Sequence, residues 1–123
     1  MKYEYDESVV KDIKKEEHIS EENYNLLSGR FFSLLTSQNG SRIIQSCISK
    51  TSLEVMSKIF IEVKDKLYIL INDQYGNYFC QKFFCSLTEI ERVSFLKNVK
   101  LIYSFILLNN LKNKNEKIKK FYF

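Results

Sequence analysis

The strongest constraint on the fold of this chain is a segment that occurs twice, 36 residues apart. The stretch LLTSQNGSRIIQSCIS, at 34–49, aligns without a gap with LINDQYGNYFCQKFFC, at 70–85. The aligned pairs include Leu34 with Leu70, Gln38 with Gln74, Gly40 with Gly76, Gln45 with Gln81, Ile59 with Phe95, and Val63 with Val99. A repeat of this length is typical of architectures in which each unit buries its apolar face against the next unit.

Each copy contains three apolar segments, which predict three helices per repeat. The first segment, at 31–35 or 67–71, is followed by a short polar turn that ends in glycine and then by a second apolar segment. The third segment opens with the capping-box spacing, in which a hydroxyl and a carboxylate satisfy free N–H groups at a helix start. The capping pairs are Thr51 with Glu54 and Thr88 with Glu91.

The composition favours an all-α fold. The chain has no proline and only three glycines among 123 residues, so little interrupts helices. The pair Asn39-Gly40 could form a hairpin turn, but no alternation of apolar and polar residues flanks it. We therefore predict an α-solenoid fragment built from three-helix repeats.

The 36-residue period also divides the chain. We expect an acidic, solvated N-terminal lead at 1–22, because these residues carry eight acids and four lysines. The remaining ranges are 23–62 for the first repeat with its capping segment, 63–98 for the second repeat, 99–111 for a partial third repeat or cap, and 112–123 for a basic tail. Leu101–Leu108 could form the first helix of that third unit, and neither flank holds a complete further copy.

Several functional classes find no support in the sequence. The N-terminus lacks a secretory signal pattern and the longest apolar run is too short to span a bilayer, so we expect a cytoplasmic protein without a membrane partner. Cys47, Cys80 and Cys85 are expected to be free and buried, and they form no C-x-x-C pair that would suggest zinc. His18 stands alone in a charged stretch, and no catalytic or P-loop motif occurs. We expect no enzyme activity, no cofactor and no small-molecule substrate.

The helix after each glycine is amphipathic in the same phase in both copies. At about 100° per residue, the polar side carries Ser41, Arg42 and Gln45 in the first copy, and Asn77, Tyr78 and Gln81 in the second. A short polar group and an amide four residues later can contact the edge of a nucleobase, and a planar side chain beside them can stack on its face. An ordinary solvated surface or a protein-binding surface remains the alternative.

These residues resemble the Pumilio (PUF) repeat family. The resemblance rests on GSRIIQ at 40–45, DQYGNYFCQKFF at 73–84 and the 36-residue spacing, and it covers roughly residues 26–108. This part of the chain is similar to the first two repeats of a Pumilio array, although such arrays have about eight repeats. Ser37 stands where the second copy has Asp73, which leaves the turn before the first recognition helix less well fixed.

The resemblance implies a solenoid whose second helices line a concave surface for single-stranded RNA, with one base bound per repeat. It implies that Asn77 and Gln81 recognise uracil with Tyr78 stacking, and that Ser41 and Gln45 recognise adenine with Arg42 stacking. Because such arrays run antiparallel to RNA, the expected dinucleotide is 5′-UA-3′. The expected partners are mRNA 3′ untranslated regions, in post-transcriptional regulation, with possible protein partners on the opposite face. The alternatives are a helical scaffold for protein–protein interaction and a truncated fragment without independent RNA binding.

Overall fold

The computed structural model describes residues 6–109 of the chain, with side chains up to residue 100, and every element in this part is helical. The α-helices are α1 (Glu7–Glu16), α2 (Glu21–Leu27), α3 (Phe31–Leu35), α4 (Gln38–Cys47), α5 (Leu53–Val63), α6 (Leu67–Asn72), α7 (Gly76–Ser86) and α8 (Glu89–Asn109). Two short 3₁₀ helices, η1 (Ile48–Lys50) and η2 (Lys64–Lys66), follow α4 and α5. The prediction of an all-α chain is confirmed, and the hairpin is correctly set aside.

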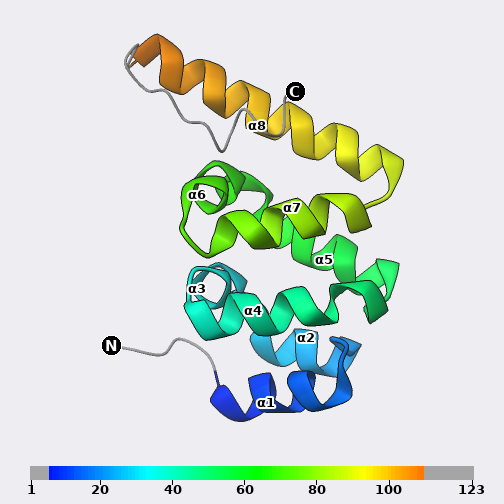
Figure 1. Ribbon diagram of the computed structural model, residues 1–123. Coiled ribbons are helices and arrows are strands. Elements are labelled where there is room, and N and C mark those ends of the chain that lie inside the picture. Colours follow the sequence, from blue (N-terminus) through cyan, green and yellow to red (C-terminus); the bar gives the residue numbers. More distant parts are fainter. Residues whose placement is uncertain (1–5, 110–123) are drawn as a thin grey trace.

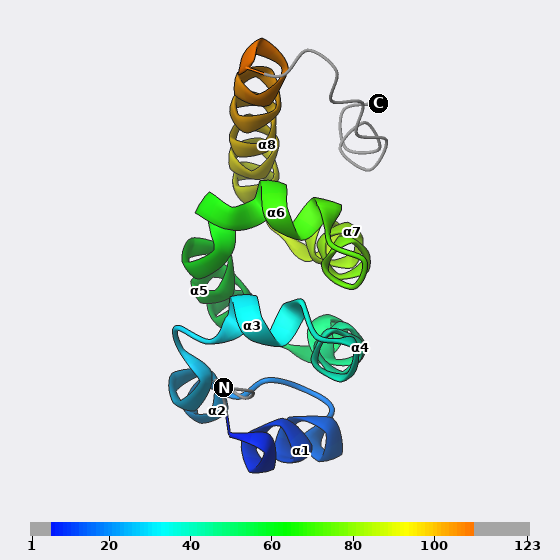
Figure 2. The ribbon, with the colours of Figure 1, turned by 90° about the vertical axis from the view of Figure 1, so that its left-hand side faces the viewer.

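The helices form a stack of two repeats with a helical pair at the N-terminal end. The first repeat consists of α3, α4 and α5, and the second of α6, α7 and α8 (Figure 1). Turned by 90°, the stack shows α4 above α1 and below α7 on one side, α2 and α5 on the other, and α3 and α6 between them (Figure 2). Helix α4 contacts both α1 and α7, as expected for neighbouring units of a solenoid.

Side-chain caps fix where the helices begin, and one of the two predicted capping boxes is wrong. At α8 the box forms, because Thr88 N donates to Glu91 Oε1 at 3.1 Å and Glu91 N donates to Thr88 Oγ1 at 3.2 Å. At α5 the N-cap is Ser52, whose hydroxyl accepts from Val55 N. Thr51 is buried and accepts instead from the backbone N–H of Ile19, a partner 32 residues away.

The core is continuous from α1 to α8. Phe79 stacks on Phe83 with ring centroids 4.8 Å apart, and Phe60 of α5 lies beside Phe95 of α8, which joins the two repeats. A single carboxylate helps to set the position of α3, because Glu62 of α5 accepts from Phe31 N at 3.0 Å. The apolar positions shared by the two copies therefore form one core rather than two.

The N-terminal segment is not the solvated lead that its charge suggested. Val9, Val10 and Ile13 of α1 and the following Ile19 are buried, while the lysines of this helix and most of its acids are exposed. Ser20 caps α2, and α2 crosses the expected boundary after residue 22. Val9, Val10 and Ile13 form an apolar stripe along an otherwise charged helix, and such a stripe is enough to pack one helix face against the core.

The C-terminal part also differs from expectation. Residues 101–108 do not begin a third unit, because α8 runs without a break from Glu89 to Asn109. In the first copy the third helix ends at Val63 and η2 follows it, whereas in the second copy the helix continues through the equivalent position, Val99. The expected basic tail at 112–123 lies outside the described residues.

All three cysteines are free, but only two are buried. Cys47 and Cys80 lie in the core, where burial raises the pKa of both thiols, whereas Cys85 is exposed. Within residues 6–100, whose side chains are described, no three His, Cys, Asp or Glu residues come together to form a metal site. No helix in the described part of the chain is long and apolar enough to cross a membrane.

Candidate RNA-binding surface

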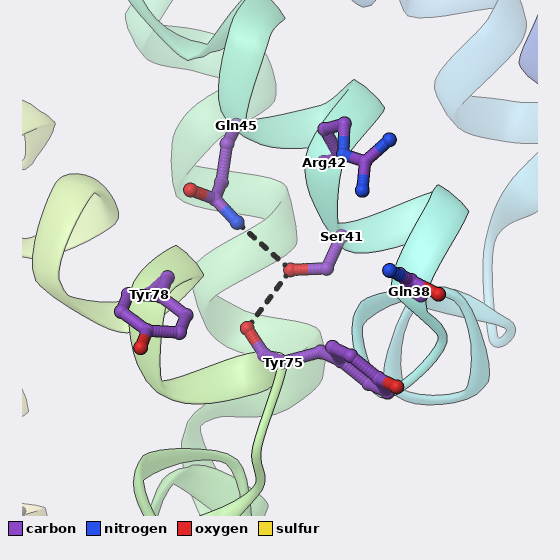
Figure 3. Close-up of a pocket in the computed structure, with 6 residues that line it drawn as sticks. All are labelled: Gln38, Ser41, Arg42, Gln45, Tyr75 and Tyr78. Atoms are coloured by element: carbon purple, nitrogen blue, oxygen red, sulfur yellow. Dashed lines mark hydrogen bonds between the residues drawn. The ribbon is translucent and has the colours of Figure 1, made fainter.

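A pocket of about 270 Å³ lies between α4 and the start of α7. It brings together four of the six predicted residues, Ser41, Arg42, Gln45 and Tyr78, with Gln38 and Tyr75 completing the lining (Figure 3). The other two predicted residues, Asn77 and Gln81, lie on α7 and do not line this pocket. The first copy therefore contributes its whole polar triplet to the pocket, and the second copy contributes its planar residue.

Ser41 is buried, although its helical phase predicted that it faces solvent. Only 1% of its surface is accessible, because the turn before α7 covers it. Its hydroxyl donates to the carbonyl oxygen of Tyr75 at 3.0 Å and accepts from Gln45 Nε2 at 3.0 Å. A hydroxyl has one donor and two acceptor sites, so a single acceptor site remains for a ligand.

Asn77 is buried as well, with 3% of its surface accessible, although the sequence predicted that it faces outward. Its Nδ2 donates to the carbonyl oxygens of Asp73 and Gln74 at 2.9 and 3.2 Å. Its Oδ1 accepts from Gln81 Nε2 at 3.3 Å. Each short polar residue is thus held by its amide partner four residues later, and in both copies the partner is half-buried.

The planar residues do point to solvent, as predicted. Tyr78 is 59% exposed and Arg42 is exposed too. They stand on opposite sides of the pocket, one from each repeat, with Ser41 and Gln45 between them (Figure 3). Among the described lining residues only Arg42 carries a charge, and this positive charge suits a ligand that carries phosphate.

Two lining residues, Gln38 and Tyr75, were not among the predicted site residues. Gln38 lies three residues before Ser41 on the same helix, so helical spacing alone could have placed it on this face. Tyr75 directly precedes α7, and nothing local in the sequence brings it to α4. Its position depends on the stacking of one repeat on the other.

The turns that lead into α4 and α7 are capped by different side chains. Asp73 Oδ2 accepts from the backbone N–H groups of Tyr75 and Gly76 at 2.9 and 2.7 Å. In the first copy Ser37 caps α4, and its hydroxyl accepts from Gly40 N at 3.1 Å and donates to Leu34 O at 2.8 Å. The expectation that the turn before α4 is less well fixed is therefore wrong, because Ser37 binds both sides of it.

A sequence profile described as the Pumilio-family RNA binding repeat matches residues 30–64 and 66–99. The two matches are consecutive, cover more than half of the chain and correspond to the two three-helix units of the structure. Comparison with curated proteins and with solved structures found no match. The profile and the repeated helical architecture together show that this chain belongs to the Pumilio (PUF) family of RNA-binding repeats.

Proposed function

We propose that this chain binds single-stranded RNA with one base per repeat and prefers 5′-UA-3′. The observation that supports it best is the pocket between Arg42 and Tyr78, which has planar groups on two sides and the Ser41–Gln45 pair between them. Single-stranded bases bind proteins in this manner, with the base face against a planar side chain and the base edge against polar groups.

The free hydrogen-bonding groups of the first repeat match adenine. Gln45 keeps its Oε1 acceptor and one Nε2 donor hydrogen, and Ser41 keeps one acceptor site. Adenine presents an amino donor beside a ring-nitrogen acceptor, and glutamine pairs with these two groups in a bidentate manner. A purine also offers the larger surface for stacking between Arg42 and Tyr78.

The free groups of the second repeat match uracil. Both hydrogens of Asn77 Nδ2 are bound by backbone carbonyls, so Asn77 presents only its Oδ1 to a ligand. That oxygen can accept from uracil N3–H, and the second hydrogen of Gln81 Nε2 can be donated to a uracil carbonyl. Because the RNA runs antiparallel to the repeats, this uracil precedes the adenine.

Two repeats give only weak affinity on their own. Stacking contributes about 1–3 kcal/mol per base, and association costs are of similar size to the total gain. We therefore expect dissociation constants in the millimolar range, and tight binding to mRNA 3′ untranslated regions in the cytoplasm requires further repeats. We keep as a proposal the division at 23–62 for the first repeat with its capping segment and at 63–98 for the second repeat.

The test is a titration of the isotope-labelled chain with two RNA oligomers, monitored by amide NMR shifts. One oligomer is UGUAUAUA, and in the other each UA is replaced by CC. The wild-type chain should bind the first oligomer at least several-fold more tightly, with shifts centred on α4 and α7. The double variant Asn77→Ala, Gln81→Ala should lose its preference for uracil over cytosine while the helical spectrum persists. Equal binding of both oligomers by the wild type, or submicromolar binding by the monomer, would contradict the proposal.

A protein-binding scaffold is the second candidate. Large apolar side chains are exposed on the outer helices, with Leu26 of α2 at 61% and Ile61 of α5 at 65%. These helices lie on the side of the stack away from α4 and α7 (Figure 2). A scaffold would be indifferent to the Asn77 and Gln81 substitutions, so the same titration separates the two candidates.

A further inference from the structure

The turn before α7 contacts the recognition pair of the preceding repeat. The carbonyl oxygen of Tyr75 accepts the only hydrogen of the Ser41 hydroxyl, at 3.0 Å. Ser41 belongs to the first repeat and Tyr75 to the second, so this hydrogen bond crosses the boundary between them. Figure 3 shows it as the lower of two bonds that meet at the Ser41 oxygen.

Asp73 sets the direction of that carbonyl group. The Tyr75 carbonyl and the Gly76 N–H belong to one peptide unit, which is planar and trans, so the two groups point in opposite directions. Asp73 Oδ2 holds the Gly76 N–H at 2.7 Å, and it also holds the Tyr75 N–H of the preceding peptide unit at 2.9 Å. With the N–H side of the unit held by the carboxylate, its carbonyl side is directed toward α4.

We propose that the Asp73–Tyr75 turn of the second repeat determines the specificity of the first repeat for its base. This inference rests on the proposed RNA-binding function and assigns a positioning role to Asp73. The turn fixes the Ser41 hydroxyl as an acceptor, so the group of the base next to it must be a donor, such as the amino group of adenine. A hydroxyl free to rotate would donate as readily as it accepts, and it would tolerate the carbonyl oxygen of guanine or uracil at the same place.

The inference predicts that base recognition is not independent in each repeat. In the wild-type chain, adenine should be preferred over guanine at the base bound by the first repeat. Replacement of Asp73 by alanine should reduce this preference by about fivefold or more, the size expected for one hydrogen bond in a bidentate pair. The conservative variant Asp73→Asn keeps an acceptor oxygen at the same position and should retain most of the preference.

The experiment measures dissociation constants for oligomers that end in UA or in UG, by NMR titration of four full-length proteins. These are wild type, Asp73→Ala, Ser41→Ala and the double variant. If Asp73 acts through Ser41, both single variants lose preference and the double variant loses no more than Ser41→Ala does, a coupling that a double-mutant cycle detects. The ratio of the two constants cancels any general loss of affinity.

Three results would overturn the inference. One is an unchanged adenine preference in a folded Asp73→Ala chain, and another is strictly additive loss in the double variant. The third is an unchanged preference in Ser41→Ala, which decides the matter even if Asp73→Ala does not fold. Absence of any base preference in the wild type would instead contradict the proposed function itself.

Discussion

Gly40 lies where the first helix of the repeat touches the second, and its replacement by alanine should destabilise the protein. A Cβ atom at this position would lie 2.3 Å from the carbonyl oxygen of Leu34, 2.6 Å from Ser37 Oγ and 2.7 Å from Leu34 Cδ1. In real proteins a Cβ atom essentially never lies closer than 3.0 Å to such a neighbouring atom. Since the closest neighbour is backbone, α3 and α4 would have to move apart.

The expected size follows from opposing effects. Alanine is better than glycine inside a helix by about 1 kcal/mol, which favours the variant. Overpacking of a close contact costs about 1–3 kcal/mol, and loss of the Ser37 cap adds about 1 kcal/mol. Steric cost and cap loss together exceed the helix gain, so we expect Gly40→Ala to lower the unfolding free energy by roughly 2 kcal/mol, the sum of these terms.

Gly76 is the matched comparison in the second copy. Its Cβ would meet one backbone oxygen, that of Leu70, at 2.8 Å, and its other neighbours are side-chain atoms at 3.1 and 3.3 Å. Gly76→Ala should therefore cost less, about 1 kcal/mol or below. Urea unfolding followed by far-ultraviolet circular dichroism measures both variants. If Gly40→Ala is as stable as wild type, or if Gly76→Ala is the more damaging change, the close-approach argument fails.

Three further predictions concern the caps and the core. Thr88→Ala removes the hydroxyl that accepts from Glu91 N in the capping box of α8, and it should lower the unfolding free energy by about 1 kcal/mol in the same assay. Glu62→Ala deprives the Phe31 N–H of its acceptor and should cost about 1–3 kcal/mol, whereas Glu62→Gln should cost less, because it keeps an acceptor oxygen. Burial raises the pKa of the Cys80 thiol in the folded chain, so the unfolded chain loses this proton first. Stability should therefore fall as pH rises above the ordinary thiol value of about 8.5, by up to about 1.4 kcal/mol per pH unit for this group. Unfolding of Cys80→Ala should show a shallower decline with pH, and an identical slope would contradict this assignment.

Local patterns in the sequence were enough to predict the repeats and their helices. The 36-residue spacing placed Gly40 and Gly76 in equivalent positions, and helical phase put Arg42 and Tyr78 on the solvent side, where the structure has them. Phase alone could not predict the burial of Ser41. That burial requires the turn of the next repeat, a contact over 34 residues, and periodicity within one helix carries no information about it.

For a similar reason, the sequence could not show which of two neighbouring residues caps α5. Thr51 and Ser52 are both suitable caps by residue type, and the spacing to Glu54 favoured Thr51. Thr51 is instead held by the N–H of Ile19, so the decision depends on where the N-terminal helices pack. Helix-breaking residues could not predict the continuous α8 either, because the first copy has no glycine or proline between 53 and 67 and its third helix still ends at Val63.

The packing of α1 on α4 determines whether the N-terminal segment stabilises the array. Ile13 is fully buried, and its carbonyl oxygen lies 3.6 Å from the Cys47 sulfur of α4, so α1 covers the end of the first repeat. Ile13→Ala should lower the unfolding free energy by about 2–4 kcal/mol, because it leaves a cavity at this interface. In an array with so few interfaces, that loss is a large share of the total stability.

The matched control is Lys14→Ala, one residue along the same helix, where the side chain is exposed. It should change the unfolding free energy by no more than about 0.5 kcal/mol. A free, solvated segment would make both substitutions neutral, whereas a docked cap makes only Ile13→Ala costly. Equal effects of the two variants would mean that α1 does not pack on α4 in solution. The first repeat would then have an uncovered apolar end, and the α4 side of the adenine pocket would lack this support.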